Sequence, residues 1–350
     1  MCSMAALCVN RRPLRWLSAW SSFSRYQTYC SQKKSPAEIR KRQNELFDEE
    51  KKRQLSFFKR IEKIRVEHVG APEDCTLIMN KGLSTPFNCA MHITELLMKR
   101  SVVACVNGQL WDMHRPLVED CQLSFLHFKQ DDCHEVNRAF WRSCSFILGY
   151  VLMSAFKDEC HVELCRFPSP NVKSGSFVYD ADLNLPNWKP TLRELYALSS
   201  IGSKLQYQDY RFEPLTVNEQ TAREMFQHNR FKLQQIPSIA SQSSSGDSIN
   251  LYRVGDHIDI SQGPMVSSTA HLGRFSLTAI HNIECPDYGK LQRVQGVAIP
   301  NQFWLHQWTY NLLEKQSQKL NWCTYPNVQK KIETEKSQPE PVQQETQMLP

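Results

Sequence analysis

The side chains best suited to catalysis or metal binding, cysteine and histidine, are plentiful in this chain but poorly spaced for either task. The sequence of 350 residues has 13 Cys and 11 His, no C-x-x-C pair, and no closer cysteines in its folded part than Cys160 and Cys165. Zinc ribbons and dithiol redox sites require the C-x-x-C spacing. Phosphate loops, dinucleotide fingerprints, zinc-protease and serine-hydrolase motifs are also missing from the sequence. We therefore expect no cofactor, no bound metal and no small-molecule substrate, and structural roles for His257, His271 and His281.

A run of charged residues at 36–60 predicts a helix that could contact nucleic acid. Ser35 can cap this helix, Pro36 suits its first turn and Glu38 completes a capping box. The segment has five acidic and eight basic side chains, and the basic set is Arg40, Lys41, Arg42, Lys51, Lys52, Arg53, Lys59 and Arg60. Basic side chains neutralise RNA phosphates, so these eight are candidates for RNA contact. A solvated linker helix is an equal alternative, because charged runs usually face water.

The excess of positive charge is concentrated before this helix. The chain has 42 Lys and Arg against 36 Asp and Glu, and residues 1–37 contain six of the basic residues and none of the acidic ones. An Arg-bearing, Ser-rich and acid-free leader is typical of a mitochondrial transit peptide, which we place at about 1–35; an uncleaved basic arm is the alternative. The longest uncharged apolar stretch, Ser143–Phe156, has 14 residues, fewer than the ~20 that a bilayer requires, so we expect no membrane span.

Residues 61–128 predict a small mixed sheet wrapped on a helix. Alternating segments at 61–69 and 75–79 flank a Gly-Ala-Pro turn, a helix capped by Thr85 runs to about Met98, and strands follow at 102–106 and 122–128. This order is that of a β-grasp fold. Within it, the segment VACVNGQLWDMHRPLVEDCQLSFLHF resembles the end of the TGS domain of threonyl-tRNA synthetases. TGS modules also occur in GTPases and stringent-response enzymes, so the resemblance implies an RNA-associated protein and little more.

The region 131–322 predicts a larger α+β domain. Its pattern indicates a buried helix at 135–156, helices at 191–206 and at 217–234 with Thr216 as the cap, a Ser/Gln loop at 238–248, several strands, and a last helix from Pro300. The segments YRVGDHIDISQGPMVSSTAHLGRFSLTAI, FWRSCSFILGYVL and GSFVYDADL resemble the second additional domain of threonyl- and alanyl-tRNA synthetases. Together with the TGS match, this similarity covers roughly 62–300. Residues 325–350, rich in Gln, Glu and Pro, are expected to be disordered.

The synthetase resemblance implies a site that hydrolyses mischarged tRNA, and this chain lacks the reactive residues for it. In the family, two His on one helix face and a Cys and a His on a loop form that site, and in alanyl relatives they bind zinc. The corresponding positions here are Arg142, Phe146, Ser261 and Met265. A guanidinium has no lone pair, a phenyl ring has no titratable proton, and a hydroxyl or thioether is a poor base and a poor zinc ligand. The resemblance therefore implies an editing domain without catalytic residues, in which Asp259 and the turn-forming Gly and Pro residues are retained.

The whole pattern resembles a family of mitochondrial large-ribosomal-subunit proteins that look like threonyl-tRNA synthetases without an aminoacylation core, since the sequence ends soon after Pro300. The resemblance implies a non-catalytic structural component of the mitochondrial ribosome, located in the matrix, with large-subunit ribosomal RNA and other mitochondrial ribosomal proteins as partners. Residues 61–350 have 28 basic and 31 acidic side chains, so we expect a peripheral position with mainly protein contacts. Two alternatives remain open: a free-standing hydrolase of mischarged threonine tRNA, and a mitochondrial RNA-binding regulator outside any particle.

Overall fold

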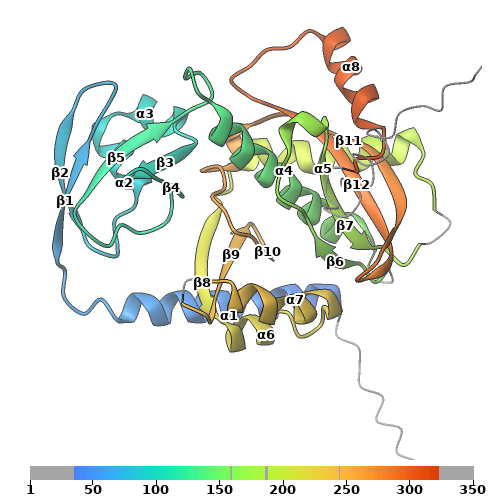
Figure 1. The fold of residues 1–350 in the computed structure, drawn as a ribbon, viewed down its shortest axis with the longest axis horizontal. Coiled ribbons are helices and arrows are strands. Elements are labelled where there is room, and N and C mark those ends of the chain that lie inside the picture. Colours follow the sequence, from blue (N-terminus) through green and yellow to red (C-terminus); the bar gives the residue numbers. More distant parts are fainter. Residues whose placement is uncertain (1–34, 158–159, 186–187, 244, 323–350) are drawn as a thin grey trace, which may run out of the picture. The chain divides into compact units, whose positions relative to one another are not determined.

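The structure, a computed structural model, describes residues 35–157, 160–185, 188–243 and 245–322 (Figure 1). The expected leader, apart from Ser35, and the expected tail at 325–350 lie outside the described residues. The described part has the predicted α+β class, with one five-stranded, one three-stranded and one four-stranded sheet. No helix of the described part is both long enough and apolar enough to cross a membrane.

The first sheet is the mixed sheet that the sequence predicts for a β-grasp fold. Its strand order is β2-β1-β5-β3-β4, and β1 runs parallel to β5 while the other pairs are antiparallel. Every second residue of β1 is buried, including Ile64 and Val66, as expected for a sheet with one face on a core. The strands are β1 Lys63–His68, β2 Cys75–Asn80, β3 Val103–Val106, β4 Gln109–Trp111 and β5 Cys121–Leu126.

The helical part of this first domain is divided where the sequence predicts one continuous helix. Thr85 caps the first helix as expected, accepting a hydrogen bond from the backbone N–H of Asn88. The prediction of a single helix to Met98 is wrong, because Thr94 adopts an extended conformation and caps a second helix through the N–H of Leu97. A β-branched residue with a hydroxyl suits a cap better than a helix interior. The two helices are α2 Pro86–Ile93 and α3 Glu95–Arg100.

The second domain places a long buried helix among two further sheets. The helix is α4 His134–Ala155, and its apolar side chains form the centre of the largest hydrophobic core. A four-stranded antiparallel sheet has the order β11-β12-β7-β6, and a three-stranded one has the order β10-β9-β8. The strands are β6 Glu163–Arg166, β7 Phe177–Asp182, β8 Glu213–Asn218, β9 Ser248–Val254, β10 His257–Ile260, β11 Leu272–Cys285 and β12 Gly289–Pro300. Two of its other helices are α5 Leu192–Gln208 and α8 Gln307–Ser317.

Three predictions for the second domain are wrong. The expected helix at 217–234 begins instead as strand β8, in which Leu215 and Val217 are buried on one face and the Thr216 hydroxyl, expected to be a cap, bonds Asn250 of β9. Two helices follow, α6 Glu219–Met225 and α7 Arg230–Ser241, capped by Asn218 and Asn229. Part of the expected loop at 238–248 therefore belongs to α7. The last helix begins at Gln307, because Pro300 still pairs with β11 as the end of β12.

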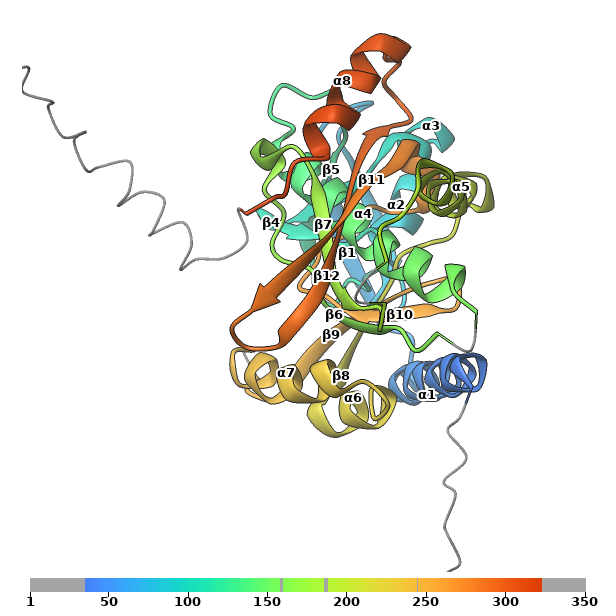
Figure 2. The same ribbon diagram turned by 90° about the vertical axis from the view of Figure 1, so that its right-hand side faces the viewer.

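Helix α1 Pro36–Ser56 packs against the second domain, although the first domain follows it in the chain. The predicted capping box of Ser35 and Glu38 is present. Leu46 and Phe47 are buried with apolar residues of β8, β9, β10, α6 and α7. Figures 1 and 2 show α1 lying alongside α6. The alternative of a solvated linker therefore does not describe this helix, because one of its faces belongs to a core.

Candidate functional site

A cleft of 640 Å³ lies where the resemblance places an editing site. Helix α4 contributes Arg142, and the segment after β10 contributes Ser261. Its other lining residues are mostly polar, among them Arg166, Lys232, Gln235, Asn250 and Tyr288. The structure therefore brings two of the four predicted positions, Arg142 and Ser261, into one cleft.

The other two positions, Phe146 and Met265, belong to the hydrophobic core and do not line the cleft. Phe146 is 0% exposed, and its ring lies 5.8 Å from that of Phe212 and 4.9 Å from that of His257. Met265 is buried as well, with its sulfur 3.5 Å from the Ser143 hydroxyl. Both side chains have become packing groups, so they present nothing to a ligand in the cleft.

The two side chains that line the cleft are occupied in supporting the backbone. The Arg142 guanidinium donates to the carbonyl of Pro264 at 2.8 Å, and its burial lowers its pKa, although arginine remains a cation in proteins. The Ser261 hydroxyl accepts a hydrogen bond from the N–H of Gly263 at 3.3 Å. No imidazole or carboxylate of the described residues hydrogen-bonds to this hydroxyl, so Ser261 has no base to activate it.

A buried ion pair lies beneath the cleft, and the sequence does not predict this pairing. Lys232 of α7 lies 2.5 Å from Asp259 of β10, and the two side chains are 3% and 1% exposed. The hydroxyl of Tyr179 donates to the second oxygen of Asp259, and burial, followed by this carboxylate, raises the pKa of Tyr179 well above its usual value. Asp259 belongs to the family motif, but no sequence pattern indicates that Lys232, on a helix with many polar residues, would be its buried partner. Retention of Asp259 is thus explained by a structural pair.

His257 is buried beside this pair and has no catalytic partner. Its Nε2 atom has no hydrogen-bond partner among the described residues, and burial lowers its pKa to about 4. The ring is therefore neutral near pH 7 and packs against Phe146 and Tyr150. No group of three or more His, Cys, Asp or Glu side chains in the described ranges is arranged to hold a metal ion.

The first domain fixes the loop that would carry the reactive Cys and His. Asp112, which follows β4, accepts hydrogen bonds of 2.8 Å from the N–H of Met265 and from the Tyr252 hydroxyl, and burial raises its pKa. His114 bonds the carbonyl of Ser267 at 2.9 Å. Gly263 has a φ of 63°, and a Cβ there would lie 1.8 Å from the Tyr252 hydroxyl oxygen. The loop therefore has a close approach that only glycine permits.

The eight candidate RNA contacts divide between the two faces of α1 and the residues after it. Three members contact other parts of the chain: Arg40 (carbonyl of Met153, 2.6 Å), Arg42 (Glu224, 3.2 Å) and Lys51 (Glu213, 2.8 Å). Arg53 pairs instead with Glu50 of the same helix at 2.7 Å. The members that are exposed and that form no ion pair within the described residues are Lys41, Lys52, Lys59 and Arg60. Three of the eight therefore hold the helix in place, Arg53 pairs within the helix, and four are exposed without an ion pair of the described residues.

Comparison with known proteins gives one domain match and two kinds of relative. Residues 73–127 match the model of the TGS domain. The large ribosomal subunit protein mL39 of Drosophila melanogaster is 46% identical over 312 residues, which are 88% of this chain and 92% of that protein. The mitochondrial threonine–tRNA ligase of Rattus norvegicus is 31% identical over 70% of this chain, and the human cytoplasmic threonine–tRNA ligase 1 is 28% identical over 64%. The aligned regions cover 32% and 29% of those two ligases.

Proposed function

The chain belongs to the family of the large ribosomal subunit protein mL39, and from this premise we propose that it is a non-catalytic structural component of the large ribosomal subunit of mitochondria. The match at 46% identity over nearly the whole of the relative carries the proposal. The Arg-bearing, acid-free segment at 1–37 supports import into the mitochondrial matrix. The ligase-like region then serves as a scaffold.

The contents of the cleft support the absence of editing activity. Hydrolysis of an ester on tRNA requires a group that activates water, and imidazole or a metal-bound water is the usual choice. At the four family positions, the chain has a guanidinium that bonds Pro264, a phenyl ring and a thioether in the core, and the hydroxyl of Ser261 without a base. Among the described residues, the lining of the cleft contains no imidazole, and its one carboxylate, that of Asp287, is not at any of the four family positions.

The exposed basic residues of the N-terminal segment are the proposed contacts with ribosomal RNA. Lys41, Lys52, Lys59 and Arg60 can reach phosphates without breaking an ion pair of the described residues. The remainder of the chain is nearly neutral, with 28 basic and 31 acidic side chains at 61–350. We therefore expect a peripheral site on the subunit, where most other contacts are made with neighbouring ribosomal proteins.

Sedimentation of a mitochondrial lysate tests the proposal directly. The full-length, tagged chain should sediment with the large subunit in a sucrose gradient and leave that position when the subunit is dissociated. If the chain stays near the top of the gradient while the subunit sediments normally, an RNA-binding regulator outside the particle becomes the better interpretation. Recovery of the chain outside the mitochondrial fraction would contradict the proposed location.

A deacylation assay tests the absence of catalysis. Purified chain is incubated with threonine tRNA that carries serine, and the release of serine is compared with the uncatalysed rate. We expect no release above that rate. Release that disappears in the Ser261→Ala variant would instead establish a hydrolase and contradict the non-catalytic assignment.

A further inference from the structure

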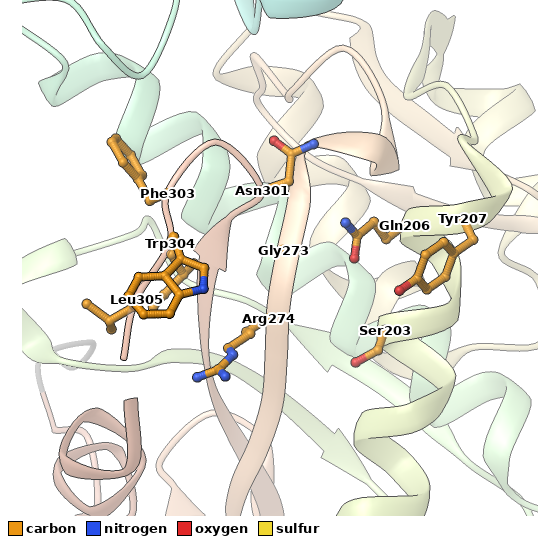
Figure 3. A pocket seen from close by; sticks show the side chains of 10 residues that line it. Ser203, Gln206, Tyr207, Gly273, Arg274, Asn301, Phe303, Trp304 and Leu305 are labelled. Carbon is orange, nitrogen blue, oxygen red and sulfur yellow. The ribbon is translucent and has the colours of Figure 1, made fainter. Parts of the chain in front are cut away.

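A second pocket lies outside the editing-type cleft and shares no lining residue with it. This cavity of 360 Å³ lies between α5, the start of β11 and the segment 301–305 that follows β12. Figure 3 shows Tyr207 and Gln206 of α5 on one side of the strand that carries Gly273, and Trp304 on the other. The polar and aromatic side chains that line it are Ser203, Gln206, Tyr207, Arg274, Asn301, Phe303 and Trp304.

Part of the wall of this pocket is tied to the rest of the fold. The N–H of Asn301 donates to the carbonyl of His271 at 3.0 Å, and the ring of Phe303 packs 6.3 Å from that of Phe128 in the core. At Gly273 a Cβ would lie 2.6 Å from the carbonyl oxygen of Ile299, so the floor here is bare backbone.

Two large aromatic side chains at this pocket are largely exposed to solvent. Trp304 is 87% exposed and Tyr207 is 85% exposed. Among the described residues, none hydrogen-bonds to the indole N–H of Trp304, the hydroxyl of Tyr207 or the side-chain amide of Gln206. Exposed aromatic surface beside free hydrogen-bonding groups marks a binding site, because a ligand would cover the former and satisfy the latter.

The charge of the pocket favours an anionic ligand. Arg274 is exposed, its guanidinium lies 5.0 Å from the centre of the Tyr310 ring, and its Nη2 donates to Gln307 at 2.8 Å. No carboxylate of the described residues pairs with Arg274, and none lines the pocket. Lys204, three residues before Tyr207 on α5, is exposed as well. A phosphate group could therefore approach without displacing an acidic side chain.

We propose that this pocket binds an unpaired base of single-stranded RNA, with the base stacked on Trp304 and its phosphate beside Arg274. Single-stranded RNA is recognised by stacking on aromatic rings and by hydrogen bonds to base edges, which the Gln206 amide and the Tyr207 hydroxyl can make. A protein partner would also use Trp and Tyr. The lack of a carboxylate and the several free polar groups favour RNA. The inference rests on the proposed function, because it names one RNA site of a ribosomal protein.

The test compares two exposed tryptophans in the full-length chain. Binding of labelled single-stranded oligonucleotides of about ten bases, uridine-rich or adenine-rich, is measured by fluorescence anisotropy, with a duplex of the same length as reference. The Trp304→Ala variant should bind the single strands about five- to one-hundred-fold more weakly. The Trp308→Ala variant is the matched control, because Trp308 is also exposed but does not line the pocket, and it should bind as the unaltered chain does.

Three results would overturn the RNA site: equal binding by the two variants, no preference for single strands over the duplex, or no RNA binding by the unaltered chain. A photo-crosslink from position 304 to a ribosomal protein in the isolated subunit would also overturn it, in favour of a protein partner. The sucrose gradient described above tests the proposed function independently of this RNA site. A chain that sediments with the large subunit but shows one of these results retains its proposed function and loses only this site.

Discussion

The positions of the family's editing site and the aromatic pocket differ in whether their aromatic residue is buried or exposed. Phe146 replaces a reactive residue of the family pattern, lies in the hydrophobic core and is 0% exposed. At the pocket, Trp304 lies outside any recognised motif and is 87% exposed. The reactive positions of the motif thus identify ancestry and a packed scaffold, whereas the proposed binding surface uses other residues, among them Arg274 of the same segment and Trp304. A family signature is therefore a poor guide to the present binding site of a chain that has lost the family's reactive groups.

The largest expected effect concerns the ion pair beneath the cleft. Asp259→Ala should lower the free energy of unfolding by about 4 kcal/mol, because it leaves the Lys232 ammonium buried without its partner. Asp287→Ala is the matched control, since Asp287 lines the same cleft but is exposed, and it should change stability by less than about 0.5 kcal/mol. Urea denaturation measures both. Equal effects of the two substitutions would show that the pair is not a structural element.

Truncating one aromatic residue in each region sharpens the comparison. Phe146→Ala should lower the free energy of unfolding by about 3 kcal/mol, because it leaves a cavity beside Phe212 and His257. Trp304→Ala should cost less than about 0.5 kcal/mol, since its ring is largely in water. The same denaturation experiment compares them. A large loss of stability in the Trp304→Ala variant would mean that this ring supports the fold and is not free for a ligand.

Acid should destabilise the chain through its buried histidines. Burial lowers the pKa of His114, His257 and His271 from 6.5 to about 4. Between these values the unfolded state binds more protons than the folded state, so stability is full above pH 6.5 and falls as the pH drops toward 4. Each ring should contribute a loss of about 2 kcal/mol between pH 6.5 and 5.

The His257→Phe variant isolates one of these contributions. Between pH 6.5 and 5 the free energy of unfolding of this variant should fall less than that of the unaltered chain. The difference should be about one third of the loss that the three rings cause together. Denaturation curves at both pH values measure the difference, and His92→Ala, at an exposed position, is the control. An unchanged pH dependence in His257→Phe would show that His257 is not buried in its neutral form.

The smallest expected effect distinguishes the two faces of α1. Replacing both Lys41 and Lys52 by Ala should reduce the slope of log binding constant against log salt concentration by about 0.7 for each single-stranded RNA phosphate lost. Lys51→Ala is the control, because Lys51 pairs with Glu213, and it should leave this slope unchanged. Titrations of labelled RNA at several salt concentrations measure the slope. Equal slopes in all variants would contradict the proposal that the exposed lysines contact RNA phosphates.

Much of the local structure could be read from neighbouring residues. The caps at Ser35 and Thr85 depend on a hydroxyl and on groups within the first helical turn, and both are present. The strand at 213–218 could not be recognised, because Thr216 and Glu219 have the spacing of a capping box while Thr216 actually bonds Asn250 across the sheet. Likewise, the division at Thr94 was hidden in an apolar pattern that continues across both helices.

Residue types alone already excluded the family's water-activating groups, since Arg142 and Phe146 lack the lone pairs of imidazole wherever they lie. The fold settled what those positions do instead: Arg142 supports the loop at Pro264, and Phe146 fills the core. The fold also paired Lys232 with Asp259. Chemical identity belongs to each residue, so a sequence reveals it directly. Burial, pairing and exposure depend on side chains distant in the chain, and these meet only when the chain folds.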